Sequence, residues 1–195
     1  MFNPNRTIIL AFTQHMLNEF LRAFPDAELA QERALETATQ TALETLLNCD
    51  CPYHDLEHTM LVVDVAQTIL AGRQLARGDL TAHQWLQAVI ASLFHDIGYL
   101  KILLRDDNEE SSIATADGTR VIPPNGSSDA FMTPYRVNRG ELFARERFAN
   151  NAAVDVDLAG QCIEMTRFPV PRGGGYEATD DLPGLVRAAD LIGQM

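Results

Sequence analysis

The chain has 195 residues, of which 46% are hydrophobic, so it is long enough and apolar enough to bury the core of one domain. Its formal net charge of −12 at pH 7 argues against a nucleic-acid polymer as partner, because such proteins need a basic surface to neutralise phosphates. No run approaches the ~20 apolar residues of a membrane span, and the N-terminus lacks the cleavage site of a secretory signal. We therefore expect a soluble, cytoplasmic protein with no membrane partner.

Helical periodicity opens the chain. Apolar residues spaced three and four apart predict a helix over 6–24, which Pro25 closes. A second helix, rich in Ala, Glu, Gln and Leu, is predicted over 27–48. The segment Asp50–Pro52 breaks it.

Two further helices are expected before residue 100. The third is predicted over 55–71, with Gly72 as its stop. Its buried stripe is expected to consist of Leu61, Val62, Val65 and Ile69. Thr81 followed by Gln84 has the form of a capping box, which predicts that a fourth helix starts there and ends near 95–98.

The periodicity then fails over 106–138. Asp117-Gly118 and the run Pro123–Gly126 are turn signals, and no alternating apolar segment is bounded by hairpin turns. A long loop inside a small domain is usually functional or disordered. We interpret this segment as a surface insertion or a lid, and the sequence predicts no strand anywhere.

Helices are expected to resume in the last third of the chain. They are predicted over 140–150 and 156–167, followed by a Pro- and Gly-rich break over 169–175. A last helix is predicted to start near Pro183 and to be still running at Met195. Because no C-cap is visible there, we expect the native protein to continue further.

The chain has only five histidines, and three of them lie in short motifs that could bind a metal ion. His54 and His58 are four apart at the start of the third predicted helix, so they share one face if both are helical. His95 and Asp96 are adjacent, so both can meet one ion only in the groove between their directions. Gly98 would permit a close backbone approach beside them.

A carboxylate in the last predicted helix completes the set. Asp190 lies in a stretch of small and apolar residues. Lone carboxylates are rarely buried unless they are paired or bind a metal, and imidazole is the commonest metal ligand near neutral pH. The alternative is that these residues are ordinary polar side chains with satisfied hydrogen bonds.

The cysteines permit a rival metal site. Cys49 and Cys51 precede His54 and His58 closely enough to form a structural zinc site with them. A Cys-x-Cys spacing is unusual for closed zinc sites, however, and this interpretation leaves His95 unexplained. The simpler interpretation is that these two thiols and Cys162 are all reduced.

The order His, His-Asp and a distant Asp resembles that of the HD superfamily of metal-dependent phosphohydrolases. Residues 53–59, Tyr-His-Asp-Leu-Glu-His-Thr, are similar to the phosphodiesterase-like Tyr-His-Asn-x-x-His-Ala segment, with Asp55 in place of Asn. Phe-His-Asp-Ile-Gly at 94–98 is a typical HD signature, and Ala-Ala-Asp at 188–190 resembles the segment of the final Asp. The resemblance covers roughly 50–195, and together the fragments are fairly specific.

The resemblance implies an all-α fold, a single HD-type helical bundle over 1–195. Residues 1–50 would form N-terminal helices and 51–195 the core of the metal site. The segment 106–138 would be a long loop insertion within that core.

The resemblance also implies the site. The ligands of a divalent metal ion (Mn, Fe, Ni, Zn or Mg) would be His58, His95, Asp96 and Asp190. His54 would be the general acid, and Asp96 would take part in catalysis as well as in metal binding. Thr166 resembles a threonine of the family's site, and Lys101, the only lysine, lies five residues after Asp96. Both are candidate contacts to substrate.

The expected activity is hydrolysis of a small, nucleotide-like phosphoester by a metal-activated water. No histidine follows His95, so a second ion would bind more weakly, through Asp96 and acids such as Glu109 and Glu110. A non-catalytic HD domain that binds a nucleotide as a sensor is the alternative function.

Overall fold

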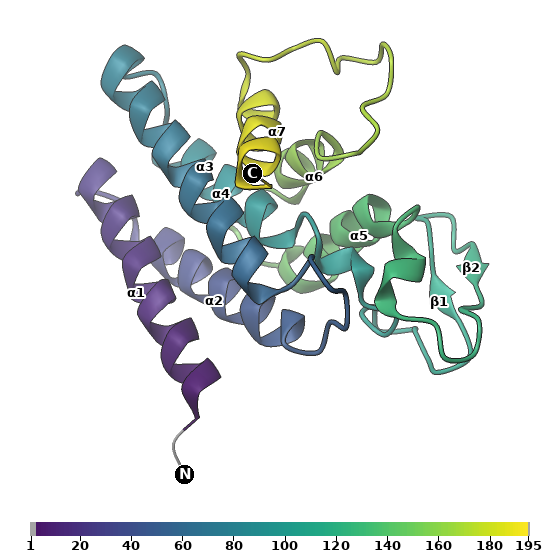
Figure 1. Ribbon diagram of the computed structural model, residues 1–195. Coiled ribbons are helices and arrows are strands. Elements are labelled where there is room, and N and C mark those ends of the chain that lie inside the picture. The colour runs from purple at the N-terminus through teal and green to yellow at the C-terminus, as the bar shows by residue number, and fades with distance from the viewer. Residues whose placement is uncertain (1–2, 195) are drawn as a thin grey trace.

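Helices account for most of the described chain. The computed structural model describes residues 3–194. Its helices are α1 (Pro4–Ala23), α2 (Leu29–Leu46), α3 (Leu56–Arg77), α4 (Ala82–Phe94), α5 (Arg136–Phe148), α6 (Val156–Glu164) and α7 (Leu182–Gly193) (Figure 1). Short 3-10 turns, η1 (Ile97–Tyr99) and η2 (Asp129–Met132), and a hairpin of β1 (Ser112–Ile113) and β2 (Arg120–Val121) complete it. The predicted all-α fold is confirmed.

Side-chain caps set where helices begin. The Asp55 carboxylate accepts a hydrogen bond from the His58 amide at 3.0 Å, which starts α3 at Leu56. The capping box predicted at Thr81 and Gln84 is present in both directions and starts α4. These two caps matter for function because α3 and α4 carry most of the candidate metal ligands.

The predicted end of α3 is wrong. The helix passes through Gly72 and ends at Arg77, where Gly78 adopts a left-handed conformation with φ of 64°. A glycine within a helix costs only about 1 kcal/mol relative to alanine, so its presence does not stop one. The buried stripe is also displaced. Leu61 is 50% exposed, whereas Val62, Val63, Ala66 and Leu70 are buried.

The limits of the later helices also differ from the prediction. Helix α5 begins at Arg136, inside the segment predicted as loop, and α6 ends at Glu164 rather than at 167. Helix α7 begins at Leu182, with Asp181 as its cap, and ends at Gly193. Since α7 ends there, the predicted continuation of the helix to the end of the chain is wrong. Met195 itself lies outside the described residues.

The prediction that the chain has no strand is wrong. β1 and β2 pair antiparallel, with Ser112 opposite Val121 and Ile113 opposite Arg120. The connecting turn contains Gly118 at φ of 84°, a conformation that favours glycine. Each strand has only two residues, which is too short to produce an alternating pattern in the sequence.

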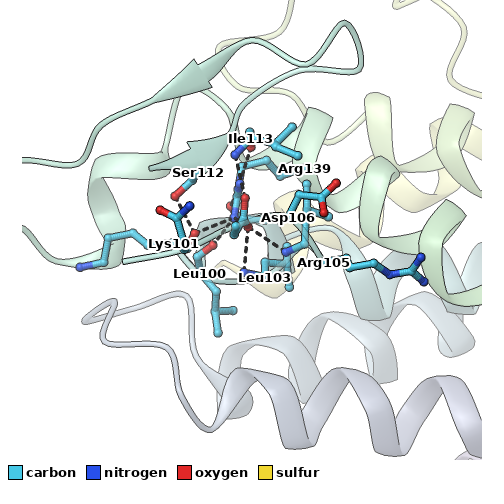
Figure 2. A network of polar contacts seen from close by, with 12 residues as sticks. Leu100, Lys101, Leu103, Arg105, Asp106, Ser112, Ile113 and Arg139 are labelled. Carbon is cyan, nitrogen blue, oxygen red and sulfur yellow. Dashed lines mark hydrogen bonds and ion pairs between the residues drawn. The ribbon is translucent and has the colours of Figure 1, made fainter. Parts of the chain in front are cut away.

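A buried arginine ties this hairpin segment to the helices. Arg139 of α5 is 0% exposed, and its guanidinium donates to the carbonyls of Gly98, Leu100, Lys101 and Ile113. It also donates to the carboxylate of Asp107 at 3.0 Å. Figure 2 shows Arg139 pointing into the segment that carries Lys101, Ser112 and Ile113. The segment predicted as a surface insertion is therefore anchored by a buried ion pair.

The core surrounds α4. Every residue from Trp85 to Phe94 is buried, and α4 packs against α2, α3, α6 and α7. A helix that is apolar on all sides belongs in the centre of a protein. The polar pair His95-Asp96 follows directly at its end, so the fold places two potential ligands inside the molecule.

Helix α7 lies beside α3 (Figure 1). The two backbones approach closely at Gly193, where an added Cβ would come within 2.7 Å of the Val62 Cγ2 atom. This contact brings the end of α7, with Asp190, against the first turns of α3, with His58. Among residues 3–194, none of the helices has the length and apolar character that crossing a bilayer requires.

Candidate metal centre

Three helices deliver the four predicted ligands to one place. His58 lies in the first turn of α3, His95 and Asp96 follow α4, and Asp190 lies on α7. All four are buried, with exposed fractions of 6%, 0%, 1% and 3% respectively. Burial of this many ionisable groups requires compensation by one another or by a bound cation.

The polar atoms of these side chains face one another. The Asp96 Oδ2 atom lies 3.1 Å from the His95 Nε2 atom and 3.4 Å from the His58 Nε2 atom. The His95 Nε2 atom lies 3.5 Å from Asp190 Oδ1. Ligand atoms of His58, His95 and Asp190 fall within 4.8 Å of one another, and the same holds for His54, His58 and Asp96.

Two imidazole nitrogens lack the partners that buried polar atoms need. The Nε2 atoms of His58 and His95 are buried and have no hydrogen-bond partner. In His95 the Nδ1 atom donates to the Ser92 carbonyl at 2.8 Å, so Nε2 is the atom that would offer a lone pair when a metal ion displaces its proton. Two such lone pairs directed at two carboxylates fit a divalent cation.

The electrostatics of the cluster also favour a positive charge. Burial opposes a charge on His95, but the Asp96 and Asp190 carboxylates outweigh burial and raise the pKa of His95 to about 9. Burial likewise acts against the charge of Asp96, yet His95 and the neighbouring imidazoles hold the pKa of Asp96 well below its usual range. A metal ion would supply the positive charge that these carboxylates stabilise.

His54 differs from the four ligands in exposure and position. Its side chain is 26% exposed, and its Nδ1 atom lies 2.5 Å from Asp96 Oδ2. His54 and His58 were expected to share a face only if both were helical, and this condition is not met, because Asp55 caps the helix and His54 precedes it. The rings nevertheless lie 5.4 Å apart, and His54 stacks on Tyr99 at 4.4 Å. His54 is therefore the solvent-facing member of the cluster.

Arg136, which was not predicted from the sequence, contacts the cluster. Its Nε atom donates to Asp96 Oδ1 at 3.2 Å, and its Nη2 atom donates to the Thr166 carbonyl at 2.7 Å. Arg136 is only 6% exposed. No signal in the sequence marked this residue, since it lies in a segment without periodicity and arginine is usually exposed.

Thr166 is connected to the cluster indirectly, through Arg136. It is buried, and its hydroxyl donates to the Ile163 carbonyl at 2.8 Å. Its own carbonyl connects to Asp96 only through Arg136. Thr166 belongs to neither group of potential metal ligands, and its contact with substrate stays a prediction.

Lys101 lies elsewhere, beside η2. Its ammonium group donates to the Ser127 carbonyl, and its amide donates to the Asp129 carboxylate at 3.1 Å. Its contact with substrate also stays a prediction. Glu109 and Glu110, the acids suggested for a second ion, are exposed and belong to neither group of potential ligands found among residues 3–194.

The cysteines also stay outside both groups. Cys49, Cys51 and Cys162 are free, as expected. The Cys49 thiol donates to the His54 carbonyl at 3.3 Å, so the thiol lies beside the backbone of His54. Within the described part of the chain, His54 groups with His58 and Asp96, and His58 also groups with His95 and Asp190; neither group contains a cysteine.

The cavities show how the cluster could be reached. A cavity of about 680 Å³ lies between α5, α6 and the loop before α7, and none of the four predicted ligands lines it. A cavity of about 240 Å³ lies beside His58 and is lined also by Tyr53, Asp55 and Gly193. The smaller cavity is the better candidate for a route to the cluster, because it is lined by His58 and by the exposed ring of Tyr53.

These features define an all-helical protein with a buried cluster of two histidines and two aspartates that suits a divalent cation. The chain belongs to the Npun_R2479-like family, whose family model matches residues 2–195. No curated protein and no solved structure matches the chain.

Proposed function

We propose that the protein is a metal-dependent phosphohydrolase of the HD type that acts on a small, nucleotide-like phosphoester. The observation that carries the proposal is the pair of buried, unpartnered Nε2 atoms of His58 and His95, which face the carboxylates of Asp96 and Asp190. Cytoplasmic localisation and the absence of a nucleic-acid polymer as partner belong to the same proposal, and the net charge of −12 supports them.

The roles of the side chains follow from their positions. His58, His95, Asp96 and Asp190 would hold the ion. When bound, a divalent ion supplies Lewis acidity, which lowers the pKa of water and neutralises charge on a phosphoryl group. The four ligands are buried, so they keep bulk water away and hold their atoms in fixed positions.

His54 is the proton donor in this proposal. Its Nδ1 atom is held by Asp96, which orients the ring and leaves the Nε2 atom for the substrate. A protonated His54 would transfer its proton to the leaving-group oxygen as the bond from phosphorus to that oxygen breaks. Such general acid catalysis contributes roughly 10²–10⁴-fold to the rate.

The proposal is tested with purified protein, a panel of phosphoesters and added Mn²⁺, Mg²⁺, Ni²⁺ or Zn²⁺. We expect metal-dependent turnover that His95→Ala abolishes. The matched control is His15→Ala, since His15 lies on α1 and its imidazole pairs with Asp64 at the surface, away from the cluster. Metal binding without turnover of any phosphoester would contradict the hydrolase and favour a nucleotide-binding sensor, the alternative function.

A further inference from the structure

The two oxygens of Asp96 face different partners. Oδ2 faces the imidazoles, at 3.1 Å from the His95 Nε2 atom and 3.4 Å from the His58 Nε2 atom. Oδ1 faces Arg136, whose Nε atom donates to it at 3.2 Å. A carboxylate can bridge two metal ions by binding one ion with each oxygen. In this protein a guanidinium group occupies the second oxygen.

We propose that Arg136 is a built-in cation that stands where a second metal ion would bind to Asp96, so that the centre holds a single divalent ion. This inference rests on the metal centre of the proposed function. It assigns Arg136 as a positioning residue, since it acts through Asp96.

The packing fixes Arg136 at both ends. Its backbone carbonyl lies so close to Gly98 that an added Cβ on that glycine would come within 1.9 Å of it. Its guanidinium donates to the Thr166 carbonyl at 2.7 Å and lies 5.8 Å from the centroid of the Tyr99 ring. Arginine stays charged at all relevant pH values, so this cation is permanent, unlike a metal ion.

The charges explain why a fixed cation is useful here. Two neutral imidazoles and two carboxylates carry a charge of −2, which one divalent ion cancels. Arg136 then gives the centre a net charge of +1. Because the chain carries a formal net charge of −12, an anionic substrate needs such a local positive centre to be attracted.

Other ligands for a second ion are limited. The nearest further ligand is His54, whose Nδ1 atom lies 2.5 Å from Oδ2. Its ring would have to turn toward Oδ1 to bind a second ion there, and Arg136 would have to be removed. The inference therefore predicts that removing the guanidinium exposes a second binding site made of His54, Asp96 and water.

The experiment counts Mn²⁺ ions by equilibrium dialysis with elemental analysis and examines their coupling by electron paramagnetic resonance. We expect one magnetically isolated Mn²⁺ per chain for the wild type and for Arg136→Lys, which keeps the charge. For Arg136→Gln we expect two ions per chain and the signal of an exchange-coupled pair. Arg187→Gln is the matched control, because Arg187 is also buried but donates only to the carbonyls of Tyr176 and Ala178, and it should bind one ion.

Three results would overturn the inference. A coupled pair in the wild type shows that Arg136 does not exclude a second ion, and a single ion in folded Arg136→Gln leads to the same conclusion. No bound Mn²⁺ in the wild type instead removes the metal centre, and with it the proposed function. If Arg136→Gln fails to fold, as judged by circular dichroism, the wild type and Arg136→Lys at millimolar Mn²⁺ decide the count.

Discussion

The solvent-facing His54 allows the proposed metal binding and the proposed catalysis to be tested separately. We predict that His54→Gln keeps its Mn²⁺ but lowers kcat by roughly 10²–10⁴-fold, because the proton donor is lost while the four ligands remain. Elemental analysis and steady-state kinetics on the best substrate of the panel would measure both. If His54→Gln loses its metal, His54 is instead a ligand, together with His58 and Asp96, with which it also groups.

A second pair of acids allows a prediction that does not depend on metal. Burial and the neighbouring Glu164 carboxylate raise the pKa of Glu141 from 4.5 to about 7. Between these two values the folded state binds more protons than the unfolded state, so the free energy of unfolding decreases as the pH rises. The variant Glu141→Gln should therefore be more stable than the wild type at pH 8, by about 1–2 kcal/mol after allowance for solvent screening.

Urea denaturation at pH 5 and pH 8 would measure this difference. At pH 5 the two proteins should unfold at nearly the same urea concentration, since Glu141 is still protonated in the folded wild type. An equal stabilisation at both pH values would show that the charge of Glu141 is not responsible.

At the scale of single residues, the sequence pointed to the four residues of the buried cluster but not to the arginine that contacts them. His58, His95, Asp96 and Asp190 could be selected because histidine and buried acid carry a recognisable chemistry. Arg136 could not, because its role depends on α5 packing against η1, which no local pattern encodes. That one Asp96 oxygen faces the imidazoles and the other the Arg136 guanidinium can be seen only in the three-dimensional structure.

At the scale of elements, the contact between η1 and α5 leaves no room for a larger side chain at Gly98. We predict that Gly98→Ala lowers the free energy of unfolding by at least about 1–3 kcal/mol, because its Cβ would lie 1.9 Å from the Arg136 carbonyl oxygen. For a domain of this size that corresponds to a fall in Tm of roughly 2–12 °C. Because Arg136 would be displaced from Asp96, Gly98→Ala should also be able to bind a second Mn²⁺, as expected for Arg136→Gln.

A second glycine is the matched control for this element. Gly72 lies inside α3 with nothing within 4 Å of an added Cβ. Gly72→Ala should therefore raise the stability, by about 0.5–1 kcal/mol, through better helix propensity. Thermal unfolding of both variants would test the pair, and a similar loss in each would contradict the role given to Gly98.

The predicted helices were found where the sequence periodicity is strong. Their limits, and the hairpin, were predicted wrongly where tertiary contacts determine the structure. All seven helices were expected, because each has an apolar face at helical spacing. Helix α5 was predicted to start too late, since its first turn holds arginines that are buried by polar contacts. The hairpin was missed because two-residue strands carry no alternation.

For the whole molecule, metal binding should be visible as stability. The centre joins α3, α4 and α7, and two of its nitrogens have no partner without an ion. At a Mn²⁺ concentration of about 100 times Kd, stabilisation should reach about 2.7 kcal/mol, a rise in Tm of roughly 5–10 °C. Differential scanning calorimetry with and without EDTA would measure this rise, and an equal rise in His95→Ala would show that the ion binds elsewhere.

The buried Arg139 connects two regions that are distant in the sequence, the backbone after the His-Asp pair and the hairpin. One end of its guanidinium network reaches Gly98, two residues after Asp96, and the other reaches Ile113 in the hairpin (Figure 2). Excising the hairpin would remove the Ile113 carbonyl from the partners of this buried guanidinium and weaken its hold on the backbone that follows the His-Asp pair. Substitutions in the hairpin should therefore weaken metal binding, as substitutions of His58, His95, Asp96 or Asp190 would, although no hairpin residue would contact the ion.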